Sequence, residues 1–293
     1  EHHEKVMSRM RKDVFPFIGG KSLSDVTPQD LLNCARRVVE RNAIETAHRM
    51  VRECGQVFQY AIITGRCSFN PAQGLTKGLP GYRGLSKNFA AFTKPDDVAR
   101  LLRIIESISA GPVVRAGLKL VSLLFVRSKE LRMAEWKDID FEAAEWRYRV
   151  TKNKNVKTLH VVPLSWQALA ILRELHPLTG HGRYVFPSGR TPDGSRPMSN
   201  MALLAALRSA GVTKEETTIH GFRAMAQTML HERLHFDRHI IEIQLTHKEM
   251  RGSLGTAYDR TEFLDDRRRM MQEWADYLDG LRAGSVRPAG AVA

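Results

Sequence analysis

The 293-residue chain has 45 Lys and Arg against 32 Asp and Glu, which gives it a formal net charge of +13. Its hydrophobic fraction of 43% is ordinary for a globular protein, and its length suffices for two domains. The positive charge favours nucleic acid over a membrane as partner, because no segment reaches the roughly 18 apolar residues of a membrane span. No secretory signal pattern opens the sequence, so we expect a cytoplasmic protein.

The cysteines and histidines give no metal pattern. Cys34, Cys54 and Cys67 have no metal-ligand spacing, and we expect buried or idle thiols in a reducing compartment. The histidines show no convincing zinc spacing, and phosphate-cradling and dinucleotide-binding motifs are absent. The sequence therefore predicts no metal site and no cofactor.

Helical patterns dominate the first 66 residues. Residues 5–19 read as a helix closed by Pro16 and Gly19, and Thr27 is a cap before Pro28 at a first helical position. We expect an all-helical module without strands.

A third helix is predicted over residues 43–65, with Gly65 as its stop signal. Its predicted apolar face consists of Met50, Val51, Val57, Phe58 and Ala61.

A change of composition marks a linker. No Asp or Glu occurs from Cys54 to Pro95, and residues 70–87 are rich in Gly and Pro. This segment is either a solvated connector or a strap along DNA phosphates, and the overall charge favours the strap. Its basic residues are Arg66, Lys77, Arg83, Lys87 and Lys94.

A second domain is predicted from Asp96 onward. Its short strand patterns are 137–142, 145–150 and 158–164, which suggest an antiparallel sheet with hairpin turns. Its helical patterns are 96–108, 113–126, 165–175, 199–211, a helix that ends near Arg233, and 265–281. The fold class predicted is mainly α with a small antiparallel β-sheet: a helical N-terminal domain followed by an α/β domain.

Strong phosphate-binding residue types are scattered over this second domain. Arg127 follows the apolar run SLLFV, so its guanidinium is held rigidly and suits bidentate contact with phosphate oxygens. The alternative is that it bonds a helix-end carbonyl or pairs with Glu130. His220 and Arg223 lie one turn apart at a predicted helix start after a threonine pair, where they are either solvated or meet an anion.

The predicted hairpin around residues 153–156 is rich in lysine. Lys152, Lys154 and Lys157 are either solvated or reach into a DNA groove. Further downstream, His247 precedes Tyr258 by eleven residues.

The order Arg, Lys, His-x-x-Arg, His, Tyr resembles that of the tyrosine recombinases, the phage integrase family. The resemblance covers nearly the whole chain and is strongest to integrases of satellite phages and genomic islands. The strings that carry it are DVFP at 13–16, ETAHR at 45–49, CGQVFQYAIITGR at 54–66, LLFVRSKELRMAEW at 123–136, VPLSWQALAIL at 162–172, HGFRA at 220–224 and RRRMMQEWADYL at 267–278.

The resemblance implies a site-specific recombinase that cuts and rejoins DNA to integrate or excise a mobile element. Tyr258 would attack a phosphodiester and form a 3′-phosphotyrosine, which stores the energy of the broken bond. Arg127 and Arg223 would hold the non-bridging oxygens and stabilise charge in the transition state.

Three further roles follow from the same resemblance. Lys154 would protonate the 5′ leaving oxygen, although the hairpin length leaves Lys152 as the alternative. His220 would be acid/base partner of the tyrosine hydroxyl, and His247 would hydrogen-bond the phosphate. Thr246 departs from the small residue that the family usually has before this histidine.

By resemblance, residues 1–85 would be a core-binding domain, 86–91 the end of the basic linker, 92–281 the catalytic domain and 282–293 a disordered tail. The implied partners are double-stranded DNA attachment sites, three further copies of the chain in a tetramer, and accessory DNA-bending or excision-directionality proteins. Residues 264–281 either dock on a neighbouring protomer or pack within their own chain. The DNA-binding candidates are Arg66, Lys77, Arg83, Lys87, Lys152 and Lys157.

Two other functions remain open at this point. A type IB topoisomerase-like enzyme uses the same residue types without pairing two DNA sites, and a non-catalytic DNA-binding regulator would keep the fold alone. The attachment-site sequence is not readable, because base recognition depends on side-chain placement in the grooves.

Overall fold

The computed structural model describes residues 2–81, 90–153, 156–191, 193–246 and 263–285, without the side chains of residues 2 and 151–158. The chain divides into two compact units, Glu1–Lys87 and Asn88–Ala293. No helix in the described part is both long and apolar enough to cross a membrane. Each unit has its own hydrophobic core.

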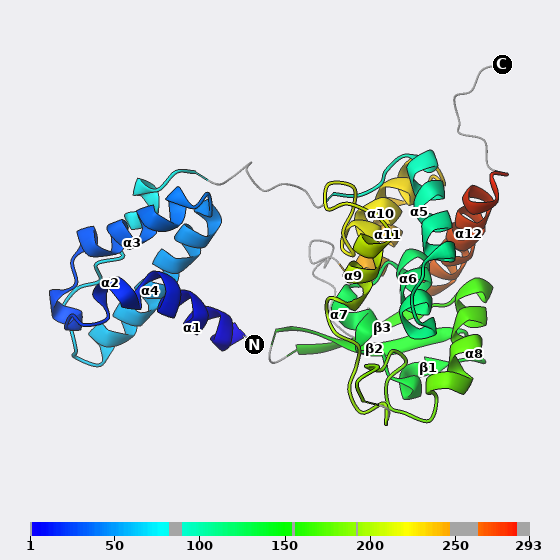
Figure 1. Cartoon of the computed structure of the whole chain (residues 1–293), viewed down its shortest axis with the longest axis horizontal. Helices are drawn as coiled ribbons and strands as arrows, with labels where there is room; N and C mark the ends of the chain where they lie inside the picture. Colours follow the sequence, from blue (N-terminus) through cyan, green and yellow to red (C-terminus); the bar gives the residue numbers. More distant parts are fainter. Residues whose placement is uncertain (1, 82–89, 154–155, 192, 247–262, 286–293) are drawn as a thin grey trace, which may run out of the picture. The chain divides into compact units, whose positions relative to one another are not determined.

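The first unit is helical throughout its described part, as predicted (Figure 1). Its elements are α1 (His2–Asp13), α2 (Phe15–Ile18), η1 (Leu23–Asp25), α3 (Pro28–Glu40), α4 (Ile44–Ile63) and η2 (Leu75–Gly78). The predicted cap is confirmed, because the Thr27 hydroxyl accepts a hydrogen bond from the Asp30 amide at 3.2 Å. Pro16 does not close the first helix, which ends at Asp13; it lies inside α2 instead. A proline fits a first helical turn, whose N–H groups have no partner within the helix.

Two predictions for this unit are wrong. Val57 is 51% exposed, although the α4 pattern placed it on the buried face. The segment from residue 70 is not linker at its start, because Ala72 and Leu79 are buried in the helical core. The Asn70 amide also donates to the Gly55 carbonyl at 3.0 Å. Gly and Pro suggested a flexible segment here, but its few apolar side chains pack on the helices.

The three thiols agree with their prediction. Cys34 and Cys54 are buried, Cys67 is partly buried, and all three are free. Burial raises the pKa of Cys54 to about 12, so this thiol is not ionised near neutral pH.

The second unit combines helices with a three-stranded antiparallel sheet, which confirms the predicted fold class (Figure 1). Its elements are α5 (Pro95–Ser107), α6 (Pro112–Leu124), α7 (Ser128–Arg132), η3 (Trp136–Asp138), β1 (Ile139–Asp140), β2 (Glu145–Asn153), β3 (Val156–Pro163), α8 (Trp166–Thr179), α9 (Ala202–Ser209), α10 (Gly221–Glu232), α11 (Arg238–Leu245) and α12 (Leu264–Ala283). The strand order is β1-β2-β3, with Trp146 opposite both Ile139 and Val162. The short helices α7 and α11, of five and eight residues, were not predicted.

Helix α12 packs within its own chain. Met270, Met271, Trp274 and Leu278 form an apolar stripe along this helix, and each is at most 3% exposed because other parts of the same chain cover it. Trp274 meets Phe125 edge-on at 6.3 Å between ring centroids, and its indole N–H donates to a backbone carbonyl of α6. The open choice between docking in trans and packing in cis is thus resolved for this stripe in favour of cis. The helix ends at Ala283, two residues beyond the predicted boundary.

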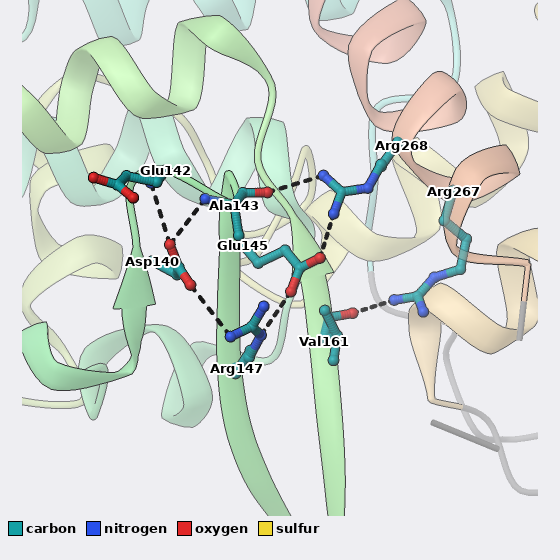
Figure 2. A network of polar contacts seen from close by, with 8 residues as sticks. All are labelled: Asp140, Glu142, Ala143, Glu145, Arg147, Val161, Arg267 and Arg268. Atoms are coloured by element: carbon teal, nitrogen blue, oxygen red, sulfur yellow. Dashed lines mark hydrogen bonds and ion pairs between the residues drawn. The ribbon is translucent and has the colours of Figure 1, made fainter. Parts of the chain in front are cut away.

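Two arginines near the start of α12 attach it to the sheet. Arg268 donates to the Ala143 carbonyl at 3.0 Å and forms an ion pair with Glu145 (Figure 2). Arg147 donates to the other oxygen of Glu145 at 2.6 Å, so one buried carboxylate holds two guanidinium groups.

Arg267 lies deeper than Arg268. It is 3% exposed and donates from Nε and one Nη to the amide oxygen of Gln244 at 2.9 and 2.7 Å. The same guanidinium donates to the Val161 carbonyl on β3 (Figure 2). Arg267 therefore joins the start of α12, the end of α11 and the sheet. Burial lowers the pKa of Arg267 to about 10, which leaves it charged at neutral pH.

Candidate active site

Arg127 is held at the junction between α6 and α7. It is the residue before the first turn of α7, and its amide donates to Glu130 Oε2 at 2.9 Å. Its guanidinium donates to Glu130 Oε1 at 2.8 Å, so the pairing considered as an alternative does occur. The Arg127 side chain is nevertheless 35% exposed and accessible to a ligand.

Arg223 lies in the first turn of α10 and points inward. The residue is only 4% exposed, and its guanidinium donates to the Phe125 carbonyl at 2.9 Å and to the Leu245 carbonyl at 2.6 Å. Burial, with the neighbouring charge of Arg127, lowers the pKa of Arg223 to about 10. Arg223 is therefore still protonated at neutral pH.

His220 lies at the N-terminus of α10, as predicted, and is exposed. Neither threonine is the N-cap of α10: that position is His220, which makes no side-chain capping bond. The hydroxyl of Thr218 does accept a hydrogen bond from the amide of Gly221, the first helical residue, at 3.1 Å. Unlike Arg223, His220 lies at the surface.

Arg127 and Arg223 both donate hydrogen bonds to the residues at the end of α11. Leu245 accepts from Arg223, and the next residue, Thr246, accepts from Arg127 at 2.7 Å through its hydroxyl. The two guanidinium groups thus lie close together, next to the Glu130 carboxylate and with Glu242 near Arg223. Guanidinium groups held in this way can bind the oxygens of an anion.

Tyr148 on β2 is a part of this arrangement that the sequence analysis missed. Its hydroxyl donates to Glu130 Oε2 at 3.1 Å. Burial and the Glu130 carboxylate hold the pKa of Tyr148 well above its ordinary value, so the phenol remains a neutral donor. A tyrosine within a strand pattern reads as ordinary core, and no sequence signal separates it from the neighbouring buried Trp146.

Several predicted residues are not placed by the structure. Lys154, His247, Tyr258, Arg83 and Lys87 lie outside the described residues. Lys152 belongs to β2 and Lys157 to β3, but the structure does not describe the side chain of either residue. Arg66 and Lys77 are exposed residues of the first unit. Among the described residues, no group of three or more His, Cys, Asp or Glu side chains is arranged to hold a metal ion.

Comparison with known protein families identifies the family to which the chain belongs. The phage integrase central domain matches residues 1–78, and the phage integrase family domain matches residues 91–258. The chain therefore belongs to the phage integrase family and is a site-specific tyrosine recombinase, an enzyme that cuts and rejoins DNA. This result favours recombination over the relaxing enzyme and the non-catalytic regulator.

The chain is similar to several named integrases. It is 37% identical to the integrase of Shigella phage Sf6 over 268 residues, which are 91% of this chain and 67% of the relative. The prophage integrase IntS of Escherichia coli (strain K12) has the same identity and coverage. The integrase of Enterobacteria phage P4 is 32% identical, over 95% of this chain and 65% of that protein.

Solved structures share the fold at lower sequence identity. A lambda integrase(75-356) dimer bound to a COC' core site has a TM-score of 0.65 and 17% identity, over 85% of this chain and 89% of that one. The Tn1549 transposon integrase in complex with circular intermediate DNA has a TM-score of 0.61 and 14% identity, over 84% and 85% of the two chains.

Proposed function

We propose that this recombinase cleaves its DNA through Tyr258 and holds the scissile phosphate with Arg127 and Arg223. The observation that carries the proposal is the shared turn at the end of α11, which receives hydrogen bonds from both guanidinium groups. Rigidly held guanidinium groups stabilise negative charge as it builds on phosphate oxygens, because they need no reorganisation during the reaction.

In the proposed reaction the Tyr258 oxygen forms a bond to phosphorus, and the bond to the 5′ oxygen breaks. The tyrosine hydroxyl loses its proton with His220 as acid/base partner, and Lys154, or alternatively Lys152, gives a proton to the leaving 5′ oxygen. His247 hydrogen-bonds the phosphate. Attack of a 5′ hydroxyl on the phosphotyrosine reverses these steps and reseals a strand, so no external energy source is needed.

We further propose double-stranded attachment sites as the substrate. A net charge of +13 suits a DNA duplex, since each neutralised phosphate releases counterions. Related folds have been solved as a lambda integrase dimer on a core site and as a lambda integrase tetramer bound to a Holliday junction. By analogy, four copies of this chain would act on two paired sites in the bacterial cytoplasm, at the nucleoid, with accessory DNA-bending or directionality proteins.

We propose that the two units have different functions. Residues 1–85 would bind the core site, 86–91 would end the basic linker, 92–281 would carry out catalysis, and the residues that follow the end of α12 at Ala283 would form a tail. The proposed phosphate contacts outside the active site are Arg66, Lys77, Arg83, Lys87, Lys152 and Lys157.

Arg223→Lys tests the phosphate-binding role. Lysine keeps the charge but lacks the planar fork, and it cannot satisfy both the Phe125 and Leu245 carbonyls. We expect strand cleavage to slow by about a hundredfold or more, while the Kd for site DNA changes by less than about threefold. Arg173→Lys, at an exposed position of α8, is the matched control. Equal losses of cleavage and DNA affinity would contradict the assigned role.

A further inference from the structure

Thr246 has a backbone conformation that disfavours its side chain. It ends α11 with φ 55° and ψ 39°, in the left-handed region. Glycine is the usual residue at such a helix end, because it has no Cβ to crowd the backbone. A β-branched residue is strained there. This strain indicates that the threonine side chain contributes something that a glycine lacks.

The contribution visible in the structure is a contact with Arg127. Thr246 Oγ1 accepts from Arg127 Nη1 at 2.7 Å, and the Thr246 carbonyl lies 3.4 Å from Nη2. Nη1 also donates to Glu130 at 2.8 Å, so its two hydrogens have acceptors on both sides. The threonine reaches the arginine across 119 positions of the sequence.

The same turn holds the second arginine through the preceding residue, because Leu245 accepts from Arg223 at 2.6 Å. The Leu245 contact is made by a carbonyl, which any residue type would supply. The hydroxyl contact, by contrast, depends on the residue being Thr or Ser. The side chain of Thr246 thus adds a specific restraint on Arg127.

We propose that the Thr246 hydroxyl is a positioning group for Arg127, which orients the guanidinium for the phosphate. The inference rests on the proposed function, because orientation matters for catalysis only if Arg127 binds the reacting phosphate. Glu130 fixes one side of Nη1, and Thr246 fixes the other. Without the hydroxyl, Arg127 keeps its charge, but the plane of its guanidinium is no longer fixed.

Three variants at this position test the proposal by single-turnover cleavage of a site duplex. Thr246→Val keeps the branched shape and removes the hydroxyl, and we expect cleavage to slow by about tenfold or more. Thr246→Ser restores most of the lost rate. Thr246→Gly relieves the backbone strain but is as slow as the valine variant. The Kd for DNA stays within about twofold in all three, since the charge of Arg127 is unchanged.

Cleavage by Thr246→Val at the rate of Thr246→Ser would overturn the proposal. A second measurement does not depend on cleavage: a double-mutant cycle of Thr246→Val with Arg127→Met, followed by urea unfolding. We expect clearly non-additive losses of stability, because the two side chains are in contact. Additive losses of stability would show that the two side chains do not interact, and would overturn the proposal even if the wild-type protein cleaves no DNA. Absence of wild-type cleavage with non-additive losses would instead count against the proposed function alone.

Discussion

Gly221 shows how little space surrounds the first turn of α10. A Cβ at this position would lie 2.4 Å from the Ala90 carbonyl oxygen and 2.4 Å from the Thr217 hydroxyl. The chain that enters the second unit therefore passes directly over the helix that carries Arg223. Only a hydrogen atom fits between the two backbones.

We predict that Gly221→Ala destabilises the second unit by about 1–3 kcal/mol, because overpacking against a backbone oxygen outweighs the better helix propensity of alanine. Urea unfolding followed by tryptophan fluorescence measures this directly, since all four tryptophans lie in the second unit. Gly189→Ala is the control, because no atom lies within 4 Å of its added Cβ. An unchanged unfolding midpoint for Gly221→Ala would refute the close approach.

At the same scale, the candidate site could be predicted only in part. Arg127 and Arg223 stand out in the sequence as phosphate-binding residue types, and the structure brings them to one turn. The groups that hold them do not stand out. Phe125 and Leu245 act through backbone carbonyls, which every residue type has. Thr246 has a conformation that threonine propensity argues against, so only the three-dimensional structure reveals its contact.

Among the elements, α12 depends on two arginines near its start. Arg267 is buried and supplies hydrogen bonds to Gln244 and Val161, whereas the Arg268 side chain is 38% exposed and shares Glu145 with Arg147. Loss of Arg267 would leave buried oxygens without their donor. Loss of Arg268 would leave Glu145 still paired.

We therefore predict different costs for two equivalent substitutions. Arg267→Met should lower the free energy of unfolding by about 2–4 kcal/mol, because methionine fills the space but satisfies neither oxygen. Arg268→Met should cost about 1 kcal/mol or less, as expected for a partly exposed ion pair. Urea unfolding of both variants, read by tryptophan fluorescence, gives the comparison. A larger loss for Arg268→Met would contradict this account of the α12 anchor.

Element prediction succeeded where local signals agree with packing. The Thr27 cap and the helix that ends near Arg233 follow from residue type and spacing, and both are present. It failed where long-range packing decides. Residues near Ala72 and Leu79 look like linker, yet the helical core buries them, and Val57 has the helical spacing of a core residue but lies at the surface.

For the whole molecule, charge, two compact units and the paired arginines agree with a recombinase that acts on DNA. Both units match parts of the phage integrase family, and relatives at 37% identity cover 91% of the chain. The overall class was predictable from the sequence, because its motifs extend along nearly the whole chain. The choice between cis and trans packing of the α12 stripe was not, since an apolar stripe requires a covering surface without specifying which one.

The most direct test of the account is covalent capture of DNA. The protein and a Tyr258→Phe variant are incubated, with EDTA present, with nicked suicide duplexes drawn from the ends of the mobile element. We predict a denaturant-stable protein–DNA adduct that mass spectrometry maps to Tyr258 and that the variant lacks. DNA binding without any adduct, or an adduct that persists in Tyr258→Phe, would contradict the proposed tyrosine chemistry.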